Sequence, residues 1–314
     1  MSLLRLFVAV FLLSTLLHRD LVAQEEKPGS VPKRPPIVGV AHIGLRTDNL
    51  DAARKFYTGV LGFQEPFSLN RPAAAGGGLL LTYFKVNDHQ YIELFPELTD
   101  PKMDRLSHIA FETTDAEQLR AYLAGKGVKV PEKLEPMQDR NRGFQIADPD
   151  GHLVEFVEFR PSSLHSRNFG KFLPQGRISQ RIIHVGVVVK DRAAADRFYK
   201  DILGFQEIWH GGMKDNDTDW VDMRVPEGTD WLEYMLNVHN PGPQELGVMH
   251  HLALGVPSVK AGYDTALQRG HKAKEPQIGR DGKWQLNLYD PNFTRVELME
   301  PKPVRKPCCS PMLE

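Results

Sequence analysis

Hydrophobic positions along the chain alternate between short apolar runs and stretches with helical spacing, which predicts strands and helices in a fixed order. The first predicted helix begins near residue 50, and its apolar side chains share one face: Leu50, Ala53, Phe56, Tyr57, Val60 and Leu61. Gly62 follows directly, as a helix stop signal does. The apolar runs LLLTYFKV and QYIELF come next and predict strands. The predicted unit is a strand, a helix and then about three strands.

This unit occurs four times. The segment VAHIGLRTDNLDAARKFYTGVLGFQEPF from Val40 matches IIHVGVVVKDRAAADRFYKDILGFQEIW from Ile182, so that His184 follows His42 by 142 positions. The later copy repeats the apolar helical face, with Ala194, Phe198, Ile202 and Leu203, before Gly204. Weaker copies are LSHIAFETTDAEQLRAYLAGKGVKV and MHHLALGVPSVKAGYDTALQRGHKA. The chain therefore consists of two halves with two modules each.

The repeats set the predicted boundaries. The first half covers 37–160, with modules 37–98 and 105–160, and the second covers 181–300, with modules 181–240 and 248–300. Residues 161–180 are expected to form a linker. Its basic side chains, and Arg181 after them, are expected to be solvated rather than to bind nucleic acid, because no aromatic stacking platform accompanies them. The proline-containing tail 301–314 is expected to be disordered, with Cys308 and Cys309 poorly placed to bond to each other.

The first 23 residues have the pattern of a secretory signal peptide, with Arg5 ahead of the apolar run LFVAVFLLSTLL. This run is shorter than the ~20 apolar residues that span a bilayer. Cleavage after Ala23 is predicted, with 24–36 as a linker. The pattern therefore predicts a secreted or periplasmic protein with no stable membrane anchor.

Composition narrows the class of protein. The 314 residues include 39 Lys plus Arg against 40 Asp plus Glu, so the chain lacks the basic excess typical of nucleic-acid binders. Two cysteines are too few for a disulfide framework. With 41% hydrophobic residues, the chain is an ordinary globular protein, and its length suggests two domains.

Each module keeps a histidine in its opening strand and a glutamate in its closing strand. The histidines are His42, His108, His184 and His251, and the glutamates are Glu93, Glu155, Glu233 and Glu297. A lone histidine of this kind is more often a core residue, but eight residues in register favour one shared explanation. A carboxylate buried unpaired in an apolar strand is costly and needs a cation. Imidazole and carboxylate together suit divalent Zn, Ni, Co, Mn or Fe rather than a thiolate-type site.

The modules resemble the vicinal oxygen chelate (VOC) superfamily, which includes glyoxalase I, extradiol dioxygenases, methylmalonyl-CoA epimerase and bleomycin or fosfomycin resistance proteins. The resemblance covers 37–300 and rests on AHIGLRTDNLDAARKFYTGVLGF with YIELF, SHIAF with DPDGHLVEF, IHVGVVVKDRAAADRFYKDILGF with WLEYM, and HHLAL with YDPNFTRVELME. It implies an α+β fold in which four βαβββ modules pair into two glyoxalase-like domains. Each domain would wrap a cavity with a metal ion at its floor, and the substrate would bind through two neighbouring oxygens.

By this resemblance, His42, Glu93, His108 and Glu155 form one metal site, and His184, Glu233, His251 and Glu297 form the other. The pairing of modules stays open, since some members use consecutive modules and others use modules from different halves or chains. Of the adjacent His250 and His251, the register of HLAL against HIGL selects His251. His152 and Glu158 are expected to be outward surface residues.

The four-ligand set resembles that of glyoxalase I, in which one glutamate leaves the metal and acts as the base. Glu155 and Glu297 are the candidate bases, and Arg46 matches an arginine that helps to bind glutathione. Pro96 and Glu97 stand where bacterial glyoxalases have an asparagine, and secretion is unusual for an enzyme that uses glutathione. The favoured interpretation is a metal-dependent lyase or isomerase acting on a small molecule, as a monomer or homodimer.

Two alternatives remain. An extradiol ring-cleaving dioxygenase would use His184, His251 and Glu297 with iron, but Glu233 would then be surplus. His239 and Tyr289 are out of register for its acid-base residue, and Phe293 replaces the glycine of DPDG. The other alternative is a non-enzymatic protein that sequesters a small molecule, as the drug-resistance members do. Those proteins often lack the metal ligands, whereas this chain has all eight.

Overall fold

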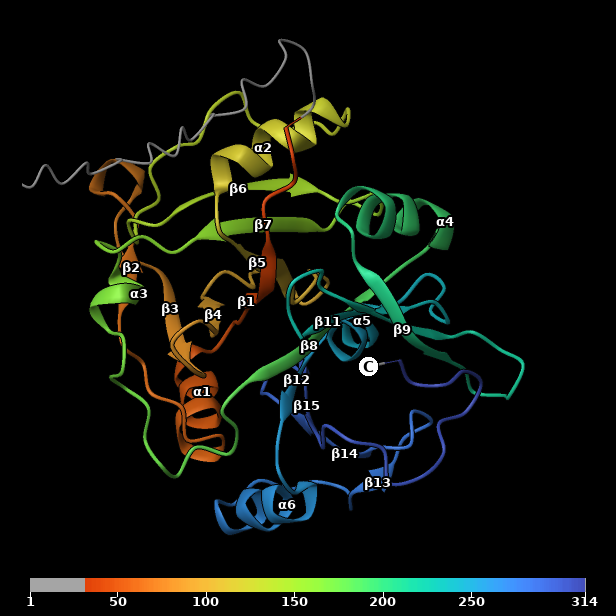
Figure 1. The fold of residues 1–314 in the computed structure, drawn as a ribbon. Helices are drawn as coiled ribbons and strands as arrows, with labels where there is room; N and C mark the ends of the chain where they lie inside the picture. Colours follow the sequence, from red (N-terminus) through yellow and green to blue (C-terminus); the bar gives the residue numbers. More distant parts are fainter. Residues whose placement is uncertain (1–31, 314) are drawn as a thin grey trace, which may run out of the picture. The chain divides into compact units, whose positions relative to one another are not determined.

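The computed structural model describes residues 32–313, which contain two β-sheets (Figure 1). The predicted signal peptide, its cleavage site and most of the 24–36 linker lie outside these residues. Within the described part of the chain, no helix has the length and apolar character to cross a membrane.

Each half of the chain forms one sheet. The first half contributes β1 (Ile37–Arg46), β2 (Ser68–Asn70), β3 (Leu79–Lys85), β4 (Tyr91–Phe95), β5 (Leu106–Thr113), β6 (Arg142–Ala147) and β7 (Leu153–Glu158). The second half contributes β8 (Ile182–Val188), β9 (Gln206–Gly211), β10 (Trp220–Arg224), β11 (Trp231–Met235), β12 (His251–Gly255), β13 (Gln277–Ile278), β14 (Trp284–Tyr289) and β15 (Arg295–Met299). The predicted α+β fold of paired βαβββ modules is confirmed, although the second module has two strands after its helix instead of three.

One helix in each module lies where the apolar periodicity predicts it: α1 (Leu50–Arg54), α2 (Ala116–Gly125), α4 (Arg192–Ala195) and α6 (Val259–Gln268). The short α3 (Leu164–Arg167) and α5 (Pro243–Met249) were not predicted. α1 continues as a π-helical segment over Lys55–Val60, and α4 does so over Asp196–Ile202. Gly62 and Gly204 follow with φ of 79° and 84°, which is the left-handed geometry of a helix C-terminus.

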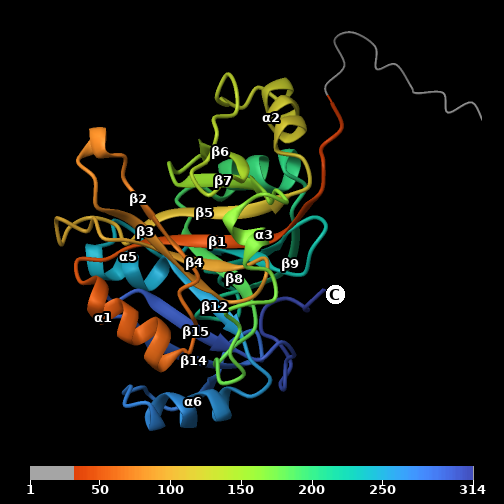
Figure 2. The ribbon, with the colours of Figure 1, turned by 90° about the vertical axis from the view of Figure 1, so that its left-hand side faces the viewer.

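Consecutive modules share a sheet. The spatial order is β2-β3-β4-β1-β5-β7-β6 in the first half and β13-β14-β15-β12-β8-β11-β10-β9 in the second. The opening strands β1 and β5 are antiparallel neighbours at the centre, and each is flanked by the closing strand of its own module in parallel register. Figure 2 shows β6, β7, β5 and β1 following one another across the first sheet. The structure thus answers the question of pairing: each half is built from two consecutive modules.

The two halves contact each other through equivalent tyrosines. Tyr57 donates a hydrogen bond to Asp290 Oδ2 across 3.1 Å, and Tyr199 donates one to Asp148 Oδ2 across 3.0 Å. Each tyrosine belongs to a helix of one half, and each aspartate to a turn before the closing strand of the other half. The largest hydrophobic core cluster also contains residues of both halves, so the halves share one core.

The linker between the halves and the C-terminal tail are more ordered than expected. In the linker, α3 is anchored because the buried Lys85 donates to the carbonyl of Asn168. In the tail, residues 301–313 contain no helix or strand, but Leu313 N donates to Ile208 O across 2.8 Å. Backbone hydrogen bonds to a neighbouring strand hold a segment that has no periodicity of its own. The expectation of a disordered tail is therefore corrected, whereas Arg167 and Lys171 of the linker are exposed to solvent, as expected.

The expectation for the cysteines was also wrong. Cys308 and Cys309 are bonded to each other, with Cys309 in a left-handed conformation at φ 73°. Trp209 Nε1 donates to the carbonyl of Cys308 across 3.1 Å, and Arg280 donates to its sulfur across 2.8 Å. These contacts with residues far away in sequence hold the turn in which the two sulfurs meet.

The turn before β15 contains a residue that its conformation does not suit. Phe293 has φ of 66°, at the place where Gly151 has φ of 91° in the first half, and both turns make the same backbone hydrogen bonds. A left-handed conformation costs a residue with a Cβ about 1–2 kcal/mol. Glycine loses about 0.5–1 kcal/mol more entropy on folding, which offsets part of this cost. The Phe293 side chain is half exposed, so it contributes little packing.

We therefore expect Phe293→Gly to raise the free energy of unfolding by about 0.5–1 kcal/mol, measured by chemical denaturation. Gly151→Ala is the matched control and should lower it by about 0.5–1 kcal/mol, because a Cβ there meets no atom within 4 Å and its strain exceeds the entropy that is gained when glycine is replaced. A Phe293→Gly variant less stable than the wild type would contradict the strain argument.

Candidate metal centres and substrate cavity

The predicted ligands lie on four adjacent strands in the middle of each sheet. In the first half, Gly44 of β1 is paired with Glu93 of β4 on one side and with His108 of β5 on the other. His42 is paired with Ala110, which is in turn paired with Glu155 of β7. Residues paired across a sheet project from the same face, and so do residues two apart in one strand. All four side chains therefore project from one face.

In the first site the side chains converge. His42 Nε2 lies 2.9 Å from His108 Nε2. The Glu93 carboxylate is 3.4 Å from His42 Nε2 and 3.5 Å from His108 Nε2, and the Glu155 carboxylate is 3.8 and 3.7 Å from the same atoms. All four residues are buried.

The second site repeats this arrangement. His184 Nε2 lies 3.0 Å from His251 Nε2. The Glu233 carboxylate is 3.1 Å from His251 Nε2 and 3.7 Å from His184 Nε2, and the Glu297 carboxylate is 3.9 and 3.6 Å from them. The structure thus brings together each of the two predicted sets of four.

The environment disfavours the charged forms of most of these groups; the exception is Glu233, whose pKa is lowered to about 2 by the neighbouring His251 and His184 despite its burial. Burial lowers the pKa of His108 to about 4 and the pKa of His42 well below its usual value. Burial raises the pKa of Glu155 to about 7 and that of Glu297 to about 8. A cation that accepts electron pairs from all four groups would offset this desolvation.

The donor atoms are also oriented for a cation. His251 Nδ1 lies 2.8 Å from the carbonyl oxygen of Met249, which fixes the ring and leaves the lone pair of Nε2 facing His184. Among the described residues, the buried Glu155 Oε1 has no hydrogen-bond partner. Two imidazole nitrogens and two carboxylates within this distance suit a divalent metal ion of the Zn, Ni, Co, Mn or Fe type. The residues present therefore fit such a metal in both halves.

Two glycines make room for the histidines. A Cβ on Gly44 would overlap the imidazole of His108, and a Cβ on Gly186 would overlap that of His251. The residues at the related positions, Ala110 and Ala253, each carry a Cβ. The requirement for glycine was not recognised from the sequence, although the shared His-X-Gly of β1 and β8 was the available signal.

The first site is covered by the linker. Tyr83 is paired across the sheet with Glu93, and the His165 ring of α3 lies 5.2 Å from the Tyr83 ring and 4.5 Å from the Tyr91 ring. His165 is 3% exposed, and its Nδ1 lies 2.8 Å from Asn141 Nδ2. Aromatic side chains and the linker histidine thus fill the space beside the first site.

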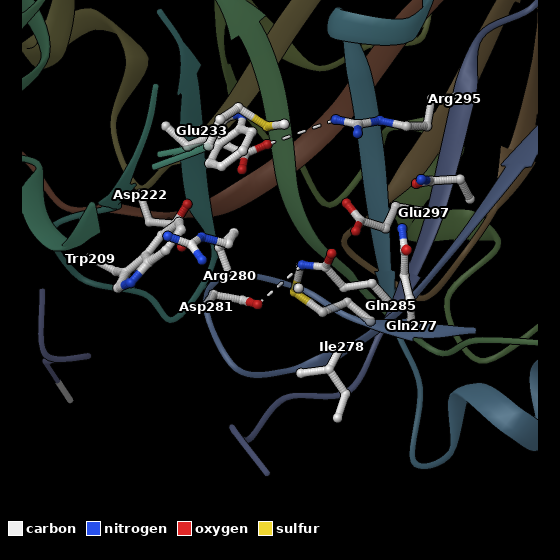
Figure 3. A pocket seen from close by; sticks show the side chains of 15 residues that line it. Trp209, Asp222, Glu233, Gln277, Ile278, Arg280, Asp281, Gln285, Arg295 and Glu297 are labelled. Carbon is white, nitrogen blue, oxygen red and sulfur yellow. Dashed lines mark hydrogen bonds and ion pairs between the residues drawn. The ribbon is translucent and has the colours of Figure 1, made fainter. Parts of the chain in front are cut away.

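The second site opens into a cavity of about 360 Å³ (Figure 3). Figure 3 shows Asp222 and Glu233 on one side and Glu297 with Gln285 on the other. The apolar part of the wall consists of Trp209, Met213, Trp220, Ile278 and Met299. Two of the four predicted ligands, Glu233 and Glu297, line this cavity directly.

The halves differ at matching positions around the sites. Opposite the first glutamate of each site, the first half has Tyr83 and the second has the buried Asp222. Two residues before the second glutamate, the first half has Leu153 and the second has Arg295. Sequence reasoning missed Asp222 and Arg295, although strand alternation places both on the face that carries the ligands.

Other residues singled out from the sequence lie elsewhere. Arg46 is held by the carbonyls of Asp104 and Leu106 and lies 3.4 Å from Glu97, so its substrate role stays a prediction. His250 faces Asp104, with Nδ1 2.9 Å from its carboxylate.

The expectation that His152 and Glu158 are outward surface residues is corrected. The His152 side chain is 12% exposed, and its Nδ1 lies 2.9 Å from Asp148 Oδ2. Glu158 is buried and accepts a hydrogen bond from Ala116 N across 3.2 Å. Both residues are drawn inward by backbone and carboxylate partners that strand alternation does not reveal.

The family follows from comparison with known proteins. The profile of the Glyoxalase/Bleomycin resistance protein/Dioxygenase superfamily matches residues 39–156 and 181–298. These ranges cover more than half of the chain, which therefore belongs to this superfamily, as the sequence motifs predicted.

Curated relatives lie among the glyoxalases. Lactoylglutathione lyase of Schizosaccharomyces pombe is 30% identical over 192 aligned positions, covering 53% of this chain and 59% of the relative. Glyoxalase I of Saccharomyces cerevisiae is 25% identical over 99 positions, covering 32% of this chain and 28% of the relative. The chain thus spans less than two thirds of the length of either relative.

Solved structures share the fold at low identity. The 2,3-dioxygenase LapB from Pseudomonas sp. KL28 has a TM-score of 0.66 at 17% identity. The superposition covers 88% of this chain and 97% of LapB. The Mn(II)-bound glyoxalase from Novosphingobium aromaticivorans has a TM-score of 0.63 at 18% identity, and the superposition covers 85% of this chain and 83% of the glyoxalase. These likenesses show that the fold is common to dioxygenases and glyoxalases.

The glycine requirement can be tested at the second site. Gly186→Ala should displace the His251 ring and lower the affinity for a divalent metal at this site by roughly tenfold or more. Isothermal titration with Co²⁺ measures the affinity. Ala253→Gly is the matched control, because it removes a Cβ from the neighbouring strand without adding one. Equal affinities for Gly186→Ala and the wild type would show that the ring does not need this space.

The cover over the first site predicts a difference in metal exchange. After loading with Co²⁺, a chelator should remove the metal from the second site at least ~10-fold faster than from the first, because the first must open locally. Cobalt absorbance follows both phases. His165→Ala should accelerate the slow phase alone. Two equal rates in the wild type would contradict this prediction.

Proposed function

We propose that the protein is a divalent-metal-dependent enzyme that binds a small molecule through two neighbouring oxygens, with its reaction at the second site. The favoured reaction is of the glyoxalase I type, a lyase or isomerase reaction through an enolate. The observation that carries this proposal is the cavity beside Glu233 and Glu297. A buried donor set that opens into a cavity of small-molecule size has room for a substrate.

The residues of the second site divide into two roles. His184, His251 and Glu233 would hold the metal, which supplies the positive charge that stabilises an enolate oxygen. Glu297 is proposed to accept the substrate proton. In the first site, Gln145 donates to Glu155 across 2.8 Å, whereas among residues 32–313 no side chain donates a hydrogen bond to the Glu297 carboxylate. Glu297 is therefore freer to turn between metal and substrate.

A ring-cleaving dioxygenase is the second candidate. Ligand atoms of His184, His251 and Glu297 all lie within 4.8 Å of one another, which is the compact triad that such a reaction on iron needs. Glu233, 3.1 Å from His251 Nε2, is a fourth donor that this triad does not need, and it favours the glyoxalase-type reaction. Sequestration of a small molecule without chemistry is the remaining alternative.

Elemental analysis of the purified protein, combined with two assays, tests the proposal. The wild type should hold two divalent ions per chain, and His42→Ala and His184→Ala should each hold one. Turnover of the hemithioacetal of methylglyoxal should be lost in His184→Ala and kept in His42→Ala. Oxygen uptake with catechol on iron would instead support the dioxygenase. A wild type that binds no metal under any loading condition would falsify the proposal.

We also propose that the protein is exported, on the basis of the N-terminal apolar run. N-terminal sequencing of the protein secreted from its host should begin at Gln24. A chain that keeps Met1 and stays in the cytoplasm would exclude export.

A further inference from the structure

Arg295 distinguishes the second site from the first. It stands two residues before Glu297 on β15, so its side chain shares the face of the ligands, whereas the matching position in the first half is Leu153. The Arg295 side chain is 15% exposed and lines the cavity. At this matched position a charged side chain thus lies beside the second site, whereas the first half has an apolar one.

Arg295 has only weak anionic partners. Its Nη2 lies 2.9 Å from His251 Nδ1 and 2.8 Å from His251 Nε2, and it lies 4.0 Å from the Glu233 carboxylate, which Figure 3 shows on the facing side. Its buried Nε has no hydrogen-bond partner among the described residues. The other cavity arginine, Arg280, pairs with Asp215 and donates to the carbonyl of Gly212.

The contacts of Arg295 compete with metal binding. Because Nδ1 of His251 faces the Met249 carbonyl, Nε2 keeps its lone pair for a metal ion, and the charge of that ion would repel the guanidinium that lies against the same ring. When a metal takes His251 and Glu233, the guanidinium loses both partners. A largely buried guanidinium without an anion is strongly disfavoured.

We infer that Arg295 is a specificity-determining residue, which binds a carboxylate of the substrate next to the two oxygens that chelate the metal. This inference rests on the proposed metal site of the second half. The planar guanidinium matches a carboxylate in a bidentate pair. A monoanionic carboxylate suits the cavity better than a phosphate dianion, because Asp222 and Asp281 also line it. The substrate class is therefore a small acid with two vicinal oxygens.

Two hydroxamates with the same four-carbon chain test this inference. Succinic monohydroxamic acid and butyrohydroxamic acid chelate a metal through the same vicinal oxygens, and differ only in a carboxylate against a methyl group. Their affinities are measured by isothermal titration on Co²⁺-loaded protein in a His42→Ala background, so that the second site alone reports. With Arg295 present, the carboxylate probe should bind at least ~10-fold more tightly, as expected for a charge-assisted pair.

Three substitutions separate the role of Arg295 from general charge and folding. Arg295→Leu, which copies the first half, should bring the ratio of the two affinities to about one, whereas Arg295→Lys should keep a preference of about threefold. Arg224→Leu, at a partly exposed arginine that donates to Gln206, should leave the ratio unchanged. Arg295→Leu should also bind Co²⁺ more tightly than its parent, since the competing cation is gone. Thermal unfolding of each variant checks the fold.

The outcomes distinguish this inference from the proposed function. If the parent binds no Co²⁺, the proposed metal enzyme fails and neither hydroxamate binds. If Co²⁺ and both hydroxamates bind with equal affinity, or if Arg295→Leu keeps the preference, the metal site stands and the role of Arg295 is overturned.

Discussion

The meeting of two buried imidazoles at the centre of each sheet is the interaction on which the rest of the structure depends. The Nε2 atoms lie 2.9 Å apart in the first half and 3.0 Å apart in the second, on antiparallel opening strands. The glutamates come from the flanking parallel strands and close the set. Four donors in an apolar sheet need a cation, and a glycine next to each pair gives the second imidazole its space. The twofold plan of each half thus serves one site.

Duplication has produced two such sites in different surroundings. The halves share a core and exchange equivalent hydrogen bonds from Tyr57 and Tyr199, so each supports the other. The residues beside the sites have changed: the first is packed with aromatic rings and His165, whereas the second faces a cavity with charged walls. Identical donors therefore differ in access, since the first site is covered and the second opens into a cavity.

Much of the fold could be predicted from the sequence because the hydrophobic positions of its helices and strands recur at regular spacing. The helical face from Leu50 to Leu61 is buried as its spacing predicts, and Gly62 ends the helix. The sequence did not reveal the order that comes from distant partners. The linker is held by Lys85 and the tail by Trp209, and neither partner is signalled near the segment that it holds.

The sequence by itself determined the family, the four modules and the eight histidines and glutamates, because strand alternation and internal repetition are local and regular. Only the tertiary structure decided that consecutive modules share a site, that α3 covers the first site and that Arg295 lies against His251. These facts depend on contacts between residues far apart in the chain. Such contacts follow from the packing of whole sheets, and no regular pattern in the sequence signals them. The difference between the two sites therefore became visible only in three dimensions.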